Sequence, residues 1–239
     1  MRRLIGGIIA LLLCFFCLGC ERQQASRKTE PEQTLQATTA AVIPTEEPQQ
    51  ETLPATQLQD TDFVSVRDYI PDIVVELKYA AEDNFTGQVI YDFQEAYLRY
   101  GTVKKLMAVQ EELREQKLSL KIWDGFRPPA AQFKLWEICP DPIYVANPNK
   151  GFSSHSRGNT VDVTLVDENG QEIEMPTGFD DFSQLADRDY SDCSFDVMLN
   201  ALLLEQTMER HGFTGYNGEW WHFTDTDAYP VEEEFTPSA

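Results

Sequence analysis

The sequence predicts an α+β fold, a single domain with a central, mostly antiparallel sheet and helices packed on it. Segments whose apolar residues recur every three or four positions, as in helices, are interleaved with segments in which apolar and polar residues alternate, as in strands. In addition, Asn169-Gly170 follows a strand-like segment and is typical of a tight hairpin turn between antiparallel strands. We expect the strands to gather in one sheet, with the helices on one side of it.

The first half of the domain predicts two helices and a strand. A helix is expected over 98–117, where the apolar side chains fall on one face; they include Val103, Leu106, Met107 and Leu113. Residues 118–123 alternate as a strand does. A second helix is predicted over 130–138, because the prolines just before it fit the first turn of a helix.

A second strand and a hairpin are predicted in the middle of the domain. Residues 161–166 alternate apolar and polar positions, which indicates a strand with one buried face. The Asn169-Gly170 turn then predicts a return strand over 171–175.

The last part of the chain predicts a third helix and a final strand. Ser194 is a suitable N-cap for a helix that continues to about residue 210, and Gly212 is a suitable terminating residue. Residues 215–218 hold two glycines and an asparagine, which indicates a turn into a strand over 220–224.

The N-terminal segment has the composition of an export signal. Residues 1–19 begin with basic residues and continue with an apolar run too short to favour a membrane span. The end of this run resembles the lipobox of bacterial lipoproteins, with Cys17 in place of the usual leucine, and predicts Cys20 as the lipidated first residue of the mature protein. Residues 20–60 predict a disordered tether. We therefore expect a membrane-anchored protein outside the cytoplasm; a secreted protein without a lipid is the alternative.

Length and charge limit the function of residues 61–239, which suffice for one globular domain. The net charge of the whole chain is −21, so nucleic acid, which needs a basic surface, is not expected as a partner. The sequence holds no repeats or basic patches of a wall-anchoring module. Cys139 and Cys193 could pair in an oxidising exterior, but they lack the spacing of a two-cysteine zinc site. Oligomeric state is not indicated.

The histidines indicate where a metal could bind. Only three occur, with His155 in a serine-rich loop and His222 in the sequence Glu219-Trp-Trp-His222. A catalytic zinc site usually takes three protein ligands and leaves a position for water. With so few imidazoles a carboxylate must complete such a site, and Asp162 and Glu219 are the candidates. The third histidine, His211, lies at the end of a predicted helix, where a structural role is expected.

Strand geometry limits how these residues could meet. Alternation places Asp162 on the face opposite its apolar neighbours. His155, seven residues earlier, could fold back over this face because Gly158 gives the backbone the needed freedom. Glu219 and His222 are three residues apart, so a regular strand would put them on opposite faces. Both can reach one site only if the backbone turns or bulges there.

At these residues the sequence resembles a known family. Ser153-x-His155-x-x-Gly158-x-Thr160-x-Asp162 is similar to the S-x-H-x-x-G-x-A-x-D motif of the zinc D,D-peptidases, with Thr160 in place of the usual alanine. Glu219-Trp-Trp-His222 resembles their E-x-W-H element, and its double tryptophan is typical of the VanX-type D-alanyl-D-alanine dipeptidases. Residues 78–87 and 123–128 agree as well, and the resemblance covers roughly residues 63–230 in order.

The resemblance implies a zinc metallopeptidase that hydrolyses D-alanyl-D-alanine or a related D,D-dipeptide, linked to peptidoglycan metabolism. It implies that His155, Asp162 and His222 bind one Zn²⁺ per chain. It further implies that Glu219 is the general base and that Arg127 stabilises the transition state. The alternative role of Arg127 is a purely structural salt bridge with Asp124.

The resemblance also implies that Tyr79, Ser153 and Asp180 help to hold the small D,D-peptide substrate. A substrate ammonium group needs an anion, and Asp181 beside Asp180 is a second candidate.

Two alternatives stay open at the level of the sequence. One is a D,D-carboxypeptidase that acts on longer wall peptides, and the other is a non-catalytic lipoprotein that binds zinc or a peptide. The presence of Glu219 and Arg127 favours an enzyme, because metal binding alone requires neither. The best-known members of the group act in the cytoplasm, so for an exported enzyme we expect scavenging or remodelling of wall-derived peptides.

Overall fold

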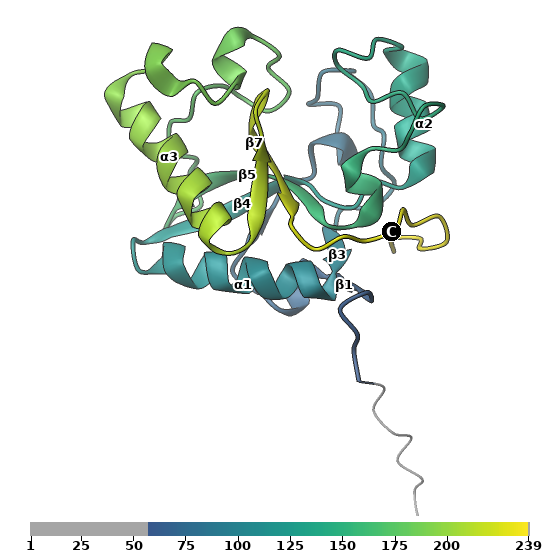
Figure 1. The fold of residues 1–239 in the computed structure, drawn as a ribbon, viewed down its shortest axis with the longest axis horizontal. Helices are drawn as coiled ribbons and strands as arrows, with labels where there is room; N and C mark the ends of the chain where they lie inside the picture. The colour runs from purple at the N-terminus through teal and green to yellow at the C-terminus, as the bar shows by residue number, and fades with distance from the viewer. Residues whose placement is uncertain (1–56, 239) are drawn as a thin grey trace, which may run out of the picture. The chain divides into compact units, whose positions relative to one another are not determined.

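The computed structural model describes residues 57–238 (Figure 1). The predicted signal over 1–19, the lipidation site Cys20 and most of the tether over 20–60 lie outside the described residues. Within 57–238, no helix has both the length and the apolar character that crossing a membrane requires.

The centre of the domain is a five-stranded sheet with the order β2-β4-β5-β7-β6. Only β2 and β4 are parallel, and the other neighbours are antiparallel. The prediction of a mostly antiparallel sheet is therefore confirmed. Its strands are β2 Val74–Val75, β4 Leu118–Asp124, β5 Thr160–Asp167, β6 Phe213–Tyr216 and β7 Glu219–Asp225.

Three α-helices accompany this sheet: α1 Tyr100–Arg114, α2 Pro129–Ile138 and α3 Phe195–Arg210. α1 packs on β4 and α3 packs on β6, and the two helices also contact each other. α2 lies apart from both, on the opposite side of Figure 1, so the expectation that all helices cover one side of the sheet holds only for α1 and α3. Their apolar faces close the core; its fully buried members include Leu106, Leu113, Leu120, Val163, Leu204 and Trp220.

The predicted helix ends are confirmed in α2 and α3. Pro129 occupies the first turn of α2, where a missing backbone N–H costs no helical hydrogen bond. The Oγ of Ser194 accepts a hydrogen bond of 3.3 Å from the Val197 amide at the start of α3. Gly212, with φ +86°, follows α3 in the left-handed conformation that ends helices.

The structure differs from the sequence prediction in several places. The sequence predicted neither β2 nor β6, and β6 includes the first two residues of the turn predicted over 215–218. β1 Phe63–Ser65 and β3 Tyr97–Arg99 form a separate two-stranded sheet, and both strands are too short for alternation to be recognised. The turn after β5 forms, but residues 171–175 are not a strand and make one bridge, from Glu172 to Val166. Pro176 follows directly, and since proline cannot donate to a strand ladder the chain leaves the sheet there.

Candidate active site

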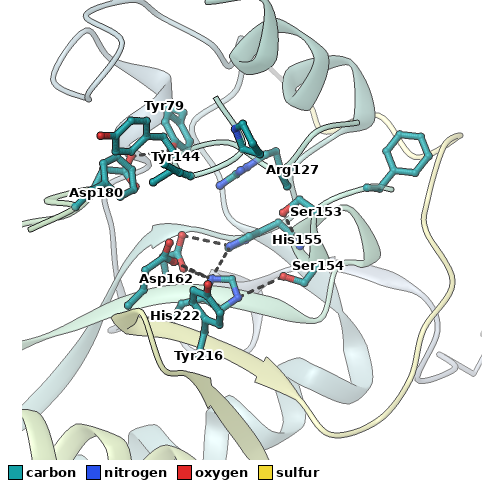
Figure 2. Close-up of a pocket in the computed structure, with 16 residues that line it drawn as sticks. Tyr79, Arg127, Tyr144, Ser153, Ser154, His155, Asp162, Asp180, Tyr216 and His222 are labelled. Carbon is teal, nitrogen blue, oxygen red and sulfur yellow. Dashed lines mark hydrogen bonds and ion pairs between the residues drawn. The ribbon is translucent and has the colours of Figure 1, made fainter. Parts of the chain in front are cut away.

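Three predicted metal ligands meet on the sheet. His155, Asp162 and His222 each offer one ligand atom, and these atoms all lie within 4.8 Å of one another. His155 Nε2 is 3.3 Å from His222 Nδ1 and 3.3 Å from an Asp162 carboxylate oxygen. His222 Nδ1 is 3.0 Å from the other Asp162 oxygen. Figure 2 shows the three side chains converging on one point.

Strand pairing brings the side chains of Asp162 and His222 together. Asp162 on β5 and His222 on β7 are directly opposite in the antiparallel register, so their side chains share one face of the sheet. His155 comes from the 3-10 helix Ser154–Arg157, which precedes β5. Gly158 ends that helix with φ +74°, and a Cβ there would lie 2.4 Å from the ring of Phe63. Only glycine therefore fits the turn that returns His155 over the strand.

Hydrogen bonds orient both imidazoles. His155 Nδ1 is 2.8 Å from the carbonyl oxygen of Gly125, which can only accept, so Nδ1 carries the proton and Nε2 faces the cluster. His222 has the opposite arrangement, because its Nε2 contacts Ser154 Oγ at 3.3 Å and its Nδ1 faces the cluster. Such contacts fix ring orientation in metal sites.

The spacing of these atoms fits zinc. Ligand atoms at about 2.0–2.1 Å from a tetrahedral ion lie roughly 3.3 Å apart, which matches the separations among His155, Asp162 and His222. Burial alone would raise the pKa of Asp162, but the two adjacent histidines outweigh it and hold the pKa below its usual range. Two imidazoles and one carboxylate leave one tetrahedral position open.

Glu219 reaches the same cluster through an irregularity in β7. Tyr216 pairs with Glu219 while the preceding Gly215 pairs with Phe223, so β7 holds extra residues at this point. This is the departure from regular strand geometry that the spacing of Glu219 and His222 required. The Glu219 carboxylate lies 3.6 Å from His222 Nδ1. Burial raises the pKa of Glu219, and the nearby Asp162 raises it further.

Arg127 lies at the edge of the cluster with its orientation fixed. Its Nε and Nη2 donate to one oxygen of Asp124 at 3.1 and 2.6 Å, and its Nη1 donates to Gln132 at 3.0 Å. The guanidinium also lies 5.0 Å from the centre of the Tyr79 ring. The salt bridge to Asp124 thus exists, and the remaining N–H groups of Arg127 are left for the pocket that it lines.

The half-buried Asp180 and the buried Tyr79 form a pair on another wall of the site. The Tyr79 hydroxyl donates to an Asp180 oxygen at 2.8 Å. Burial raises the pKa of Asp180 to about 8 in spite of this hydrogen bond, so a cation beside the carboxylate would favour its charged form. Asp181 instead accepts from the Ser183 amide at 2.9 Å and does not line the pocket. Of these two aspartates, only Asp180 therefore lines the pocket.

One cavity of about 330 Å³ connects these groups. Every side chain proposed for metal binding, catalysis or substrate contact lines it: Tyr79, Arg127, Ser153, His155, Asp162, Asp180, Glu219 and His222. Ser153 caps the 3-10 helix that carries His155, because its Oγ accepts from the His155 amide at 3.4 Å.

Comparison with known proteins identifies the family. The family model Peptidase_M15, described as D-ala-D-ala dipeptidase, matches residues 59–238. The chain belongs to the M15 peptidase family. This membership confirms the family resemblance of the sequence motifs and the prediction that the chain is a peptidase.

Individual relatives agree with the family model. The D-alanyl-D-alanine dipeptidase of Escherichia coli is 38% identical to this M15 peptidase over 173 residues, which are 72% of this chain and 89% of the relative. The D-alanyl-D-alanine dipeptidase of Enterococcus faecium is 30% identical over 189 residues, 70% of this chain and 94% of the relative.

Among solved structures, the vancomycin resistance D,D-pentapeptidase VanY in complex with Zn(II) matches with a TM-score of 0.38 at 15% identity. That match covers 55% of this chain and 74% of VanY. The LD-carboxypeptidase LdcB matches with a TM-score of 0.39 at 16% identity, over 72% of this chain and 71% of LdcB.

Sequence reasoning missed Arg188, which holds the irregular strand of this M15 peptidase in shape. Its Nη2 donates to the carbonyls of Trp220 and His222 at 3.1 and 3.0 Å, and its Nε donates to the Tyr216 carbonyl at 2.9 Å. A Cβ at Gly215 would lie 2.3 Å from the guanidinium carbon, so this approach requires glycine. A single arginine in a loop carries no pattern that could have indicated this role.

His211, Cys139 and Cys193 do not line the peptidase pocket. His211 Nε2 is 2.8 Å from a Glu112 carboxylate oxygen, in agreement with the structural role expected for it. Cys139 and Cys193 are both free and half-buried.

Proposed function

We propose that this M15 peptidase is a zinc-dependent enzyme that hydrolyses D-alanyl-D-alanine or a related D,D-dipeptide. The observation that carries the proposal is the single pocket in which a zinc-compatible triad, the raised-pKa carboxyl of Glu219 and the oriented guanidinium of Arg127 face one another. The names of its relatives, which are D-alanyl-D-alanine dipeptidases, support this substrate class.

His155, Asp162 and His222 would hold the zinc ion. When bound, zinc polarises a carbonyl group and lowers the pKa of a coordinated water. Glu219, whose half-buried carboxyl lies beside the triad, is positioned to accept a proton from the attacking water and to pass it to the leaving amine. The N–H groups of Arg127 that Asp124 and Gln132 do not use would donate to the developing oxyanion.

Asp180 would bind the free ammonium group of the substrate. Its half-buried carboxylate lacks a cationic partner within hydrogen-bond distance among residues 57–238, and a substrate ammonium group would favour the charged form that desolvation disfavours. The Tyr79 hydroxyl fixes the position of this carboxylate, and Ser153 contributes a hydroxyl to the same pocket.

The decisive test replaces Glu219 with glutamine, which keeps the size of the side chain and removes the carboxylate that would act as general base. We expect kcat for D-Ala-D-Ala to fall roughly 10²–10⁴-fold, the range for a positioned general base, with zinc content unchanged. Glu233→Gln, an exposed position outside the pocket, is the matched control. Hydrolysis near the wild-type rate by Glu219→Gln would rule out this mechanism.

The same assay separates the alternative functions. The domain is tested with and without a chelator on D-Ala-D-Ala, L-Ala-L-Ala and a pentapeptide that ends in D-Ala-D-Ala. Cleavage of the pentapeptide alone would indicate a D,D-carboxypeptidase, and bound zinc without turnover would indicate a binding protein.

We also propose that the enzyme acts outside the cytoplasmic membrane on wall-derived peptides, anchored through a lipid on Cys20. The signal-like composition of residues 1–19 and the lipobox resemblance support this location. Cys20→Ala should release the full chain from the membrane fraction. A wild-type chain that fractionates with the cytosol would contradict the proposal.

A further inference from the structure

Two aromatic rings meet at the wall of the pocket near Asp180. Tyr144 belongs to the segment between α2 and the 3-10 helix of His155, and Phe182 follows two residues after Asp180. Their ring centroids are 4.9 Å apart with an interplanar angle of 55°. Both side chains line the cavity that holds the metal triad, so the contact joins two loops across its wall.

The ring of Phe182 is held in place from behind. It makes an edge contact with Phe85 at 5.7 Å, and Phe85 in turn packs on Tyr79 at 6.3 Å. Tyr79 is the residue whose hydroxyl bonds Asp180. Figure 2 shows Tyr144, Tyr79 and Asp180 grouped on one side of the pocket, away from Ser154 and His222. The aromatic contact therefore lies beside the predicted ammonium position.

We propose that Tyr144 and Phe182 determine the length of the substrate by closing the pocket beyond its amino group. This inference rests on the proposed function and names the residues that restrict it to dipeptides. A longer substrate carries an acyl group on the nitrogen that Asp180 would bind, and each added residue extends the chain by about 3.3–3.6 Å. Both rings line the cavity beside Asp180 with their centroids 4.9 Å apart, so an acyl group that extends from this nitrogen would meet them.

At this wall, the charge requirement of Asp180 and the bulk of the two rings both disfavour longer substrates. An acylated nitrogen is a neutral amide, so it lacks the positive charge that would favour the ionised form of Asp180, whose pKa desolvation raises. The rings of Tyr144 and Phe182 add a steric barrier. Substitution of the two rings removes this barrier and leaves the Asp180 carboxylate in place.

The test compares dipeptide and tripeptide substrates in Tyr144→Ala and in the double variant Tyr144→Ala/Phe182→Ala. We expect the ratio of kcat/KM for D-Ala-D-Ala-D-Ala to that for D-Ala-D-Ala to rise at least about tenfold in the double variant, mainly through a lower KM for the tripeptide. Tyr144 is 45% exposed, so its single variant keeps the fold even if loss of Phe182 does not. The control is Phe195→Ala, which removes a 68% exposed ring from α3, outside the pocket.

The outcomes separate this inference from the proposed function. Absence of D-Ala-D-Ala hydrolysis by the zinc-loaded wild type would refute the proposed function itself. Wild-type enzyme that cleaves the dipeptide and the tripeptide equally well would refute only the aromatic wall. The aromatic wall would also be refuted if the ratio of kcat/KM for the tripeptide to that for the dipeptide stayed unchanged in a folded Tyr144→Ala variant and in the double variant, measured alongside Phe195→Ala.

Discussion

Tyr91 offers the sharpest test of how the site is held in shape, because one hydroxyl supports the carboxylate that orients Arg127. The Tyr91 side chain is 3% exposed, and its hydroxyl donates to Asp124 Oδ1 at 2.7 Å. The other Asp124 oxygen receives both hydrogen bonds from Arg127. Burial, reinforced by the adjacent Asp124, raises the pKa of Tyr91 well above 10, so the hydroxyl remains a donor through the alkaline range.

Tyr91→Phe removes this donor and leaves the Gly125 amide, at 2.9 Å, as the remaining hydrogen bond to Asp124 Oδ1. A hydrogen bond to a charged group stabilises a protein by about 1.5–3 kcal/mol. With a urea m-value of about 2 kcal/mol per molar, we expect the unfolding midpoint to fall by roughly 1 M. Since Arg127 loses part of its support, kcat for D-Ala-D-Ala should fall with it.

The assay is urea unfolding followed by tryptophan fluorescence, and Tyr97→Phe is the matched control. The Tyr97 hydroxyl makes no hydrogen bond within residues 57–238, so its loss should leave the midpoint within error of wild type. If Tyr91→Phe and Tyr97→Phe unfold at the same urea concentration, the Tyr91 hydroxyl does not support Asp124, and the reasoning fails.

Three further predictions concern the glycine turn, the metal and an ion pair. Gly158→Ala should lower the free energy of unfolding by more than about 2 kcal/mol, since a left-handed backbone costs an alanine roughly 1–2 kcal/mol and the new Cβ would also clash with the Phe63 ring. The control is Gly170→Ala, which has open space around it and should show the backbone cost alone when both variants are unfolded with a chemical denaturant. Chelation should lower the calorimetric unfolding temperature, because zinc at about 1,000 times its Kd stabilises the folded state by about 4 kcal/mol; an unchanged temperature would contradict zinc binding to the native triad. The pKa of Asp72 falls from 3.8 to about 2, chiefly through its hydrogen bonds from Arg114. Because the folded-state pKa is depressed, the Asp72 carboxylate stabilises the fold above the unfolded-state pKa of 3.8. The destabilisation by Asp72→Asn, under about 1 kcal/mol for this half-exposed pair, should therefore shrink below pH 4 and vanish only below pH 2 in pH-dependent unfolding.

The sequence predicted much of the secondary structure because helices and long strands have recognisable periodic patterns of apolar and polar residues. Within the helix predicted over 98–117, residues 100–114 form α1, while residues 98 and 99 belong to β3; the alternation of 161–166 became β5. The Ser194 cap was correct because capping depends on the next three residues alone. The short strands β1, β2, β3 and β6 were missed, since strands of two to four residues carry no detectable period.

The types of residue in the site were also available from the sequence, because zinc chemistry requires imidazole and carboxylate ligands and the chain holds few histidines. Their meeting was decided by tertiary structure. Asp162 faces His222 only because β5 pairs with β7 in one register, and Glu219 joins them only because β7 is irregular beside Tyr216.

The sequence by itself therefore determined the helices, the long strands, the family motifs and the ligand types, all of which depend on neighbours in the chain or on side-chain chemistry. Only the tertiary structure placed Asp180 rather than Asp181 in the pocket wall, bonded Arg188 to the carbonyls of the β6–β7 hairpin and brought Tyr144 against Phe182. These contacts join segments far apart along the chain, and they form because strand register and loop packing fix distances that no local pattern encodes.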